Sequence, residues 1–162
     1  CQFMYYSLAR TNEISNIKVG DIGRYNPGQI YLAEQYSKNR QARNITIPPQ
    51  LAYILKNFLK KHPSPPDHYL FGRKFIPGPD KFPSPQMADR FRVNVLDRLQ
   101  YNDDYTLYSW KHTGVVNLYM AGITPASIRM QAGHTNTQSF EKYLKSLGLF
   151  RNEEIINSYP TI

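Results

Sequence analysis

The sequence has one cysteine, Cys1, and no apolar run long enough to cross a membrane. One cysteine cannot form an internal disulfide, and a membrane-spanning helix needs about 18 or more apolar residues. The four histidines lack the spacing of a metal site, and no glycine-rich phosphate loop or serine-hydrolase motif occurs. These absences argue against a disulfide scaffold, a membrane protein and the common metal or nucleotide enzymes. We expect no cofactor, no metal and a reducing, cytoplasmic compartment.

Acidic residues are also scarce. The 162 residues include 12 Asp and Glu against 20 Lys and Arg, which gives a net charge of +8 and a pI of about 9.6. Such an excess favours a polyanionic partner, because Lys and Arg neutralise phosphates and release their counterions. A soluble basic domain without such a partner has the same composition, so charge alone leaves both interpretations open.

The length is typical of one domain, and we expect residues 1–162 to form a single one. The chain begins without an initiator methionine or a signal-peptide pattern, and we expect it to be a fragment of a longer protein. Apolar spacing predicts a mainly helical α+β fold with a small antiparallel sheet. Helices are predicted over 3–18, from Pro49 onward, and over 86–100, 106–120, 124–133 and 140–147; strands are predicted over 29–34 and 44–47.

Some details of these elements can be tested directly. Arg10 is expected near the middle of the first helix, and Thr106 and Thr124 are expected to cap helices. Seven prolines between Pro63 and Pro85 predict a wandering loop with a short extended piece. The helix over 86–100 is expected to bury a stripe of side chains spaced by four: Met87, Phe91, Val95 and Leu99.

Several short motifs are widely separated along the chain. Arg10-Thr-Asn-Glu13-Ile14 leads to Asp21-Ile22, Ser37-Lys38-Asn39 precedes a strand ending at Pro48, and Gly133-His134 is followed by Tyr143, nine residues after the histidine. Together they resemble the catalytic domain of the tyrosine recombinase (phage integrase) family over about residues 4–148. The segments 109–114 and 145–150 look like integrases of mobile elements in Bacteroides-type bacteria.

One segment departs from the family pattern His-x-x-Arg-His. Here it reads Tyr108-Ser-Trp-Lys111-His112. Tyr108 and Lys111 are three residues apart on a helix, so they share a face and are expected to reach the same phosphate. Lysine keeps the charge but loses the bidentate geometry of arginine. We expect an active enzyme with a variant site, slowed by about tenfold to a hundredfold unless the site has adjusted.

The resemblance implies a reaction. Tyr143 would attack a DNA phosphodiester and form a 3'-phosphotyrosyl link, which conserves the bond energy so that neither metal nor ATP is needed. Arg10 would stabilise the charge on the phosphate, and Lys38 would protonate the leaving 5'-oxygen. His134 would donate to a phosphate oxygen or help transfer the proton of the nucleophile. Contacts with the DNA backbone are expected from Arg40, Arg43, Arg90 and Arg92.

Each residue also has a purely structural interpretation. Tyr143 lies on an apolar helix stripe, and Arg10 with Glu13 is an ordinary i to i+3 surface pair. A basic hairpin tip around Lys38 can simply follow a phosphate. We expect His112 to be a packing histidine that supports the site, and Trp110 to lie in the core.

The resemblance further implies double-stranded DNA as partner, a homotetramer on DNA, an upstream DNA-clamping domain and a bacterial, nucleoid-associated location. The tail over 148–162 is expected to pack on a neighbouring subunit through Leu149, Phe150, Ile155 and Ile156. Three rivals stay open: a type IB topoisomerase, a catalytically silent DNA-binding relative, and an unrelated RNA-binding protein, for which no aromatic RNP pair or GXXG loop is found.

Overall fold

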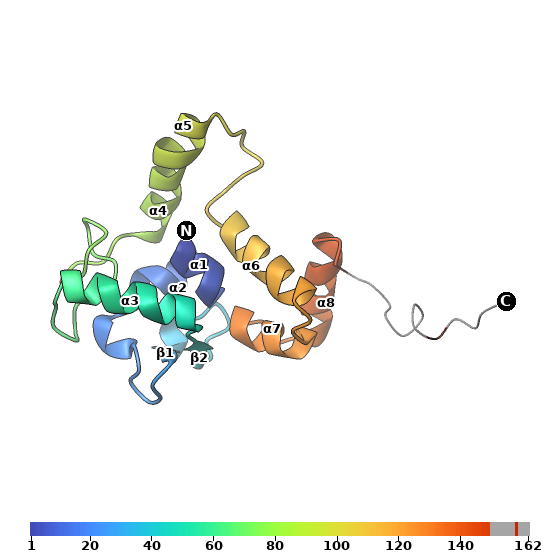
Figure 1. The fold of residues 1–162 in the computed structure, drawn as a ribbon, viewed down its shortest axis with the longest axis horizontal. Helices are drawn as coiled ribbons and strands as arrows, with labels where there is room; N and C mark the ends of the chain where they lie inside the picture. The colour runs from blue at the N-terminus through green and yellow to red at the C-terminus, as the bar shows by residue number, and fades with distance from the viewer. Residues whose placement is uncertain (150–157, 159–162) are drawn as a thin grey trace.

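The computed structural model describes residues 1–149 and residue 158. Its first part contains α1 (Gln2–Ser7), α2 (Thr11–Asn16), η1 (Val19–Asp21), β1 (Gln29–Leu32), η2 (Glu34–Tyr36), β2 (Arg43–Thr46) and α3 (Pro49–Lys61). The rest contains α4 (Ser84–Phe91), η3 (Arg92–Leu96), α5 (Asp97–Leu99), α6 (Ser109–Met120), α7 (Pro125–Ala132) and α8 (Thr137–Ser146) (Figure 1). The predicted helical fold with a small antiparallel sheet is confirmed. None of the described helices has the length and apolar character that crossing a membrane requires.

The sheet consists of β1 and β2, which pair antiparallel with Ile30 opposite Ile45. Both isoleucines are fully buried, while their strand neighbours are more exposed, as expected for a sheet that covers a core with one face. The connection between the strands, residues 33–42, contains η2 and carries Lys38 on its exposed part. The hairpin that the sequence predicts is therefore present.

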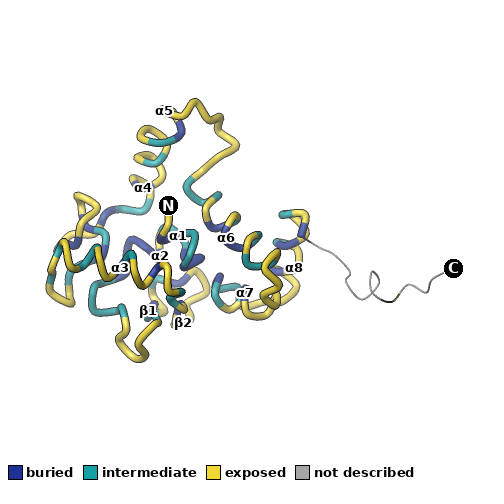
Figure 2. The backbone as a smooth tube through the Cα atoms, viewed as in Figure 1, coloured by how far each residue is buried: buried dark blue, intermediate teal, exposed yellow. Residues whose placement is uncertain are grey.

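Two hydrophobic cores lie side by side. The larger one joins α1, α2, the sheet, α3 and Met87 of α4, whereas the smaller one joins α6, α7 and α8. Leu8, directly after α1, is fully buried in the smaller core and so connects the halves. Figure 1 shows α6, α7 and α8 grouped beside the first part, and Figure 2 shows buried backbone where the groups meet, with a largely exposed arm formed by α4 to α5. The candidate site lies along this junction.

The prediction of one helix over residues 3–18 was wrong. Leu8 adopts a left-handed conformation with φ 54°, which ends α1, and Arg10 is extended (φ -78°, ψ 156°) at the N-cap of α2. The turn lets Leu8 enter the smaller core while Phe3 and Met4 enter the larger one. Arg10 therefore stands at a helix start between the two cores, where its side chain can reach α6 and α7.

The buried stripe predicted for residues 86–100 holds only for its first part. Met87 is buried, but Leu99 is 62% exposed, and the buried residue is Leu96, which directly follows the predicted Val95. The cause is the π-helical turn η3, whose wider winding shifts the buried face by one residue. The next helix begins at Ser109 rather than after Thr106, and Trp110 is 37% exposed, so its expected core position was wrong.

Gly114 allows α6 to approach α1. A β-carbon at this position would overlap the carbonyl oxygen of Tyr5 and lie 2.6 Å from a methyl group of Leu8. We expect Gly114→Ala to lower the free energy of unfolding by about 1 to 3 kcal/mol, although alanine alone favours a helix. Urea denaturation tests this, with Gly78→Ala as control because its nearest contact would be an ordinary 3.9 Å. A stabilised Gly114→Ala protein would contradict the close approach.

Candidate active site

The residues that the motifs single out come together from distant parts of the chain. Arg10 starts α2, Tyr108 and Lys111 lie at the start of α6, His134 follows α7, and Tyr143 lies on α8. The contacts join neighbouring members: the charge of Arg10 acts on the Tyr108 phenol, Lys111 lies 5.8 Å from the Tyr108 ring, and the His134 ring stacks on the Tyr143 ring with centroids 5.2 Å apart. Five predicted side chains thus form one cluster.

Glu13 positions Arg10. Its carboxylate accepts a hydrogen bond from the Arg10 backbone nitrogen at 2.7 Å and pairs with the Arg10 guanidinium at 3.2 Å. The same guanidinium donates to the carbonyl oxygen of Gly133 at 3.4 Å, which ties α2 to the end of α7. Glu13 is only 1% exposed, so the surface-pair interpretation does not describe this pair. The Arg10 side chain keeps 17% of its surface exposed, which leaves it accessible to a ligand.

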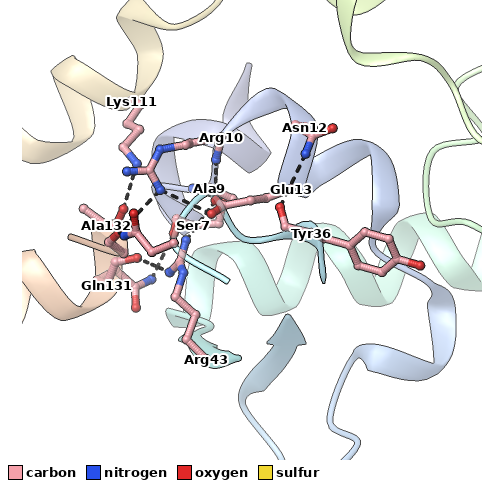
Figure 3. Close-up of polar contacts among 12 residues, drawn as sticks. Ser7, Ala9, Arg10, Asn12, Glu13, Tyr36, Arg43, Lys111, Gln131 and Ala132 are labelled. Carbon is pink, nitrogen blue, oxygen red and sulfur yellow. Dashed lines mark hydrogen bonds and ion pairs between the residues drawn. The ribbon is translucent and has the colours of Figure 1, made fainter. Parts of the chain in front are cut away.

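Arg43 joins the same network from β2. Its guanidinium pairs with Glu13 at 2.9 Å and donates to the carbonyl oxygen of Gln131 at 2.6 Å. Figure 3 shows Arg43 approaching Glu13 from the sheet, while Arg10 approaches Glu13 from the opposite side and Lys111 points to Ala132. The side chain is 13% exposed and packs against Gly133. The structure thus places Arg43 inside the protein as a link between β2, α2 and α7, and its predicted DNA contact stays a prediction.

Lys111 is fully buried. Its ammonium nitrogen donates to the carbonyl oxygen of Ala132 at 2.9 Å and lies 5.8 Å from the centre of the Tyr108 ring. Burial, followed by the nearby positive charge of Arg10, lowers the pKa of Lys111 to about 6, with Glu13 opposing the shift. In the absence of an anion, Lys111 is therefore mostly neutral at neutral pH, and a bound anion would favour its charged form.

This lowered pKa has a consequence for stability. Between about pH 6 and 10 the unfolded chain carries a proton on Lys111 that the folded chain lacks, so stability rises with pH by about 1.4 kcal/mol per unit. We expect Lys111→Met, similar in shape but uncharged, to flatten the rise and to be the more stable protein at pH 7. Urea denaturation of both proteins from about pH 7 to 9 tests this. Parallel profiles would contradict a neutral Lys111.

Tyr143 lies at the edge of the smaller core. Asn136 caps α8 by accepting a hydrogen bond from the Ser139 backbone nitrogen, and Phe140 and Leu144 are buried on the same helix. The Tyr143 hydroxyl is 2.8 Å from Nδ1 of His112. Burial raises the pKa of Tyr143, and Tyr108 raises it further, although Arg10 opposes them. The hydroxyl therefore keeps its proton until a base removes it.

His134 has a free nitrogen in this cluster. Gly133 ends α7 in a left-handed conformation with φ 68°, and this turn delivers His134 to the Tyr143 ring. Nε2 of His134 is buried without a hydrogen-bond partner. Burial, then the charges of Lys111, Arg10, Lys38 and Arg43, lower the pKa of His134 to about 4. A buried polar atom without a partner, on a ring that feels several positive charges, points to an anionic ligand.

Other predicted residues lie around this cluster. Lys38 and Arg40 are exposed on the strand connection, which Asn39 fastens to the carbonyl oxygen of Gly133 at 3.2 Å. Lys38 is near enough for its charge to act on His134. Arg90 and Arg92 lie apart on the arm from α4 to α5. There Arg90 covers the rings of Phe75 and Phe82, and Arg92 pairs with Asp103 at 3.4 Å on the surface.

Comparison with known proteins shows which family the chain belongs to. The sequence description of the phage integrase family matches residues 1–148. The chain belongs to the phage integrase family. No curated protein matches it.

Known structures of tyrosine recombinases share the fold of this integrase-family chain. A crystal structure of XerA recombinase has a TM-score of 0.69 at 15% identity, covering 99% of this chain and 55% of that one. A Tn1549 transposon integrase in complex with transposon right end DNA has a TM-score of 0.69 at 13% identity, with 96% and 55% covered. XerH site-specific recombinase bound to difH substrate has a TM-score of 0.65 at 14% identity, with 98% and 44% covered. The chain therefore spans about half the length of these proteins.

Sequence reasoning undervalued His112 in this family member. The expectation of a packing role is incomplete, because Nδ1 of His112 directly faces the Tyr143 hydroxyl. Its position next to Lys111 in the sequence was the available signal.

Among residues 1–149 and 158, no cluster of His, Cys, Asp or Glu could hold a metal ion. Leu149 is buried in the smaller core of its own chain, and its role as an anchor on a neighbour stays a prediction. Phe150, Ile155 and Ile156 lie outside the described residues.

Proposed function

We propose that this chain is the catalytic part of a site-specific recombinase that breaks and rejoins double-stranded DNA through a covalent link to Tyr143. One observation carries the proposal: the Tyr143 hydroxyl lies beside His112, while the ring stacks on His134, whose Nε2 is unpartnered and whose ring feels the charges of Arg10, Lys38 and Arg43. A hydroxyl nucleophile beside a hydrogen-bond donor and several cationic side chains fits attack on a phosphodiester.

The residues divide the work as follows. The Tyr143 oxygen attacks phosphorus and forms a 3'-phosphotyrosyl bond, so the energy of the broken bond is kept for rejoining. Arg10 holds the non-bridging oxygens with its planar fork, and Nε2 of His134 donates to one of them. Lys38 gives a proton to the leaving 5'-oxygen. Its position on an exposed hairpin tip lets it reach a DNA strand lying over the site.

Lys111 and Tyr108 replace the family's Arg and His. Lys111 would take up a proton when the phosphate arrives, since an opposite charge nearby favours the ammonium form. The charged Lys111 would then add to the positive potential around the phosphate, together with Arg10. Both Arg10 and His134 are close enough to Lys111 for electrostatic effects. Tyr108 adds one hydroxyl next to Arg10. A variant site of this kind supports catalysis with one bidentate cation rather than two.

DNA binding is proposed to extend beyond the scissile phosphate. Arg40 on the strand connection, with Arg90 and Arg92 on the exposed arm, would contact the DNA backbone and make affinity fall steeply with salt. The XerH and Tn1549 integrase structures were solved with DNA, which supports this partner. We propose further that the whole protein has an upstream DNA-clamping domain and acts as a homotetramer on paired sites.

A nicked DNA substrate tests the function. Cleavage near the nick releases a short oligonucleotide that diffuses away, so a covalent complex accumulates if Tyr143 attacks. We expect a denaturant-resistant protein–DNA band with the wild-type protein. Absence of any band on a family of substrates would favour the silent DNA-binding relative. Relaxation of a supercoiled plasmid that lacks paired sites would instead favour a type IB topoisomerase.

A further inference from the structure

The nearest polar neighbour of the candidate nucleophile is a histidine from another helix. His112 lies on α6 and Tyr143 on α8, and their Nδ1 and Oη atoms are 2.8 Å apart. The ring of Tyr108 meets the His112 ring edge-on with centroids 4.9 Å apart, and the His112 and Tyr143 centroids are 5.4 Å apart. The contact therefore belongs to a packed group of three rings rather than to a freely rotating side chain.

The protonation states fix the direction of this hydrogen bond. Burial, then the charge of Lys111, lowers the pKa of His112, so its imidazole is neutral at neutral pH. A neutral imidazole has one nitrogen that accepts and one that donates. Tyr143 keeps its phenolic proton, since burial raises its pKa. The hydroxyl thus donates to Nδ1, which leaves the His112 proton on Nε2.

His134 is not placed to do the same. Its ring lies nearly parallel to the Tyr143 ring, with 19° between the planes, and its Nε2 has no partner. The nitrogen lone pair of an imidazole lies in the ring plane, so a stacked ring does not direct it at the neighbouring hydroxyl. His134 is therefore left to donate to the phosphate.

We propose that His112 is the proton acceptor for Tyr143, an inference that rests on the proposed function. As Oη attacks, the bond from oxygen to phosphorus forms, the bond from phosphorus to the 5'-oxygen breaks, and the phenolic proton moves to Nδ1 of His112. The departing 5'-oxygen takes a proton from Lys38. In rejoining, the 5'-hydroxyl attacks phosphorus and returns its proton to Lys38, while His112 returns its proton to the Tyr143 oxygen.

A pair of substrates separates the two proton transfers. We would measure single-turnover formation of the covalent complex on nicked DNA with an ordinary 5'-oxygen and on DNA with sulfur in that bridging position. Sulfur leaves without needing a proton, so the sulfur substrate should restore the rate of Lys38→Ala. It should not restore the rate of a variant that lacks the His112 base. We expect His112→Gln to be slower by about 10²-fold or more on both substrates. His62→Gln, at the end of α3, serves as the matched control with an unchanged rate.

A second measurement distinguishes loss of the base from poor folding of the His112→Gln protein. Installing 3,5-difluorotyrosine at position 143 makes the phenol more acidic, so His112→Gln should regain at least about tenfold of its rate, whereas damaged folding would not respond. A His112→Gln rate within threefold of wild type, or recovery of the His112→Gln rate on the sulfur substrate, would overturn the role of His112. Either result would leave the proposed function in place. A wild-type protein that forms no complex on either substrate would overturn the proposed function and this role with it.

Discussion

Tyr143→Phe is expected to abolish the covalent complex with nicked DNA while leaving folding and DNA affinity nearly unchanged. Phenylalanine keeps the ring that stacks on His134 and packs near Phe140, and lacks only the attacking oxygen. Loss of the hydrogen bond to His112 should lower the free energy of unfolding by about 1 kcal/mol. No side chain can replace an oxygen that becomes part of the product.

Tyr108→Phe is the matched control, because Tyr108 is a second half-buried phenol in the same cluster. It should still form the complex, only more slowly, since it loses one hydroxyl near Arg10. Both variants would be compared by gel analysis of the covalent band and by filter binding of DNA. A band that persists in Tyr143→Phe and vanishes in Tyr108→Phe would move the nucleophile to position 108.

Arg10→Ala is expected to slow covalent complex formation by about 10² to 10³-fold, the usual cost of removing one preorganised charge donor from a transition state. Lys111 is fully buried and hydrogen-bonded to the Ala132 carbonyl oxygen, so Arg10 is the more accessible cation beside Tyr108. Arg10→Lys should recover part of the rate, because it restores charge without the bidentate fork. Single-turnover rates on nicked DNA measure the effect.

The control for Arg10 is Arg24→Ala. Arg24 also pairs with a carboxylate three residues away, Asp21 at 3.5 Å, but it is half exposed and outside the cluster. Its loss should leave the rate unchanged. Glu13 keeps its second partner Arg43 when Arg10 is removed, so the folded state should survive the substitution. An Arg10→Ala rate within threefold of wild type would contradict the assignment of Arg10.

Patterns within one element could be predicted from the sequence. Thr124 caps α7 by accepting a hydrogen bond from the Ser127 backbone nitrogen, and Gly133 ends that helix, as expected. Phe140 and Leu144 bury one face of α8, which leaves Tyr143 at its edge. The spacing from His134 to Tyr143 could single out the proposed nucleophile because it spans only one turn and one helix.

Features that depend on how elements meet could not be predicted in the same way. The left-handed Leu8 and the π-helical turn that buries Leu96 are set by packing between distant segments, and local periodicity does not register them. The full burial of Lys111 follows from α6 crossing the end of α7, where the Ala132 carbonyl oxygen accepts its hydrogen bond. The contact of His112 with Tyr143 needs the approach of α6 to α8.

The most direct test of the account is the identity of the covalent bond. Nicked DNA labelled on either side of the break would be trapped with the wild-type protein, digested with a protease, and the DNA-bearing peptide sequenced by mass spectrometry. The account predicts a 3'-phosphate attached to the peptide that contains Tyr143. A 5'-linked DNA end, or attachment to a peptide without Tyr143, would contradict it.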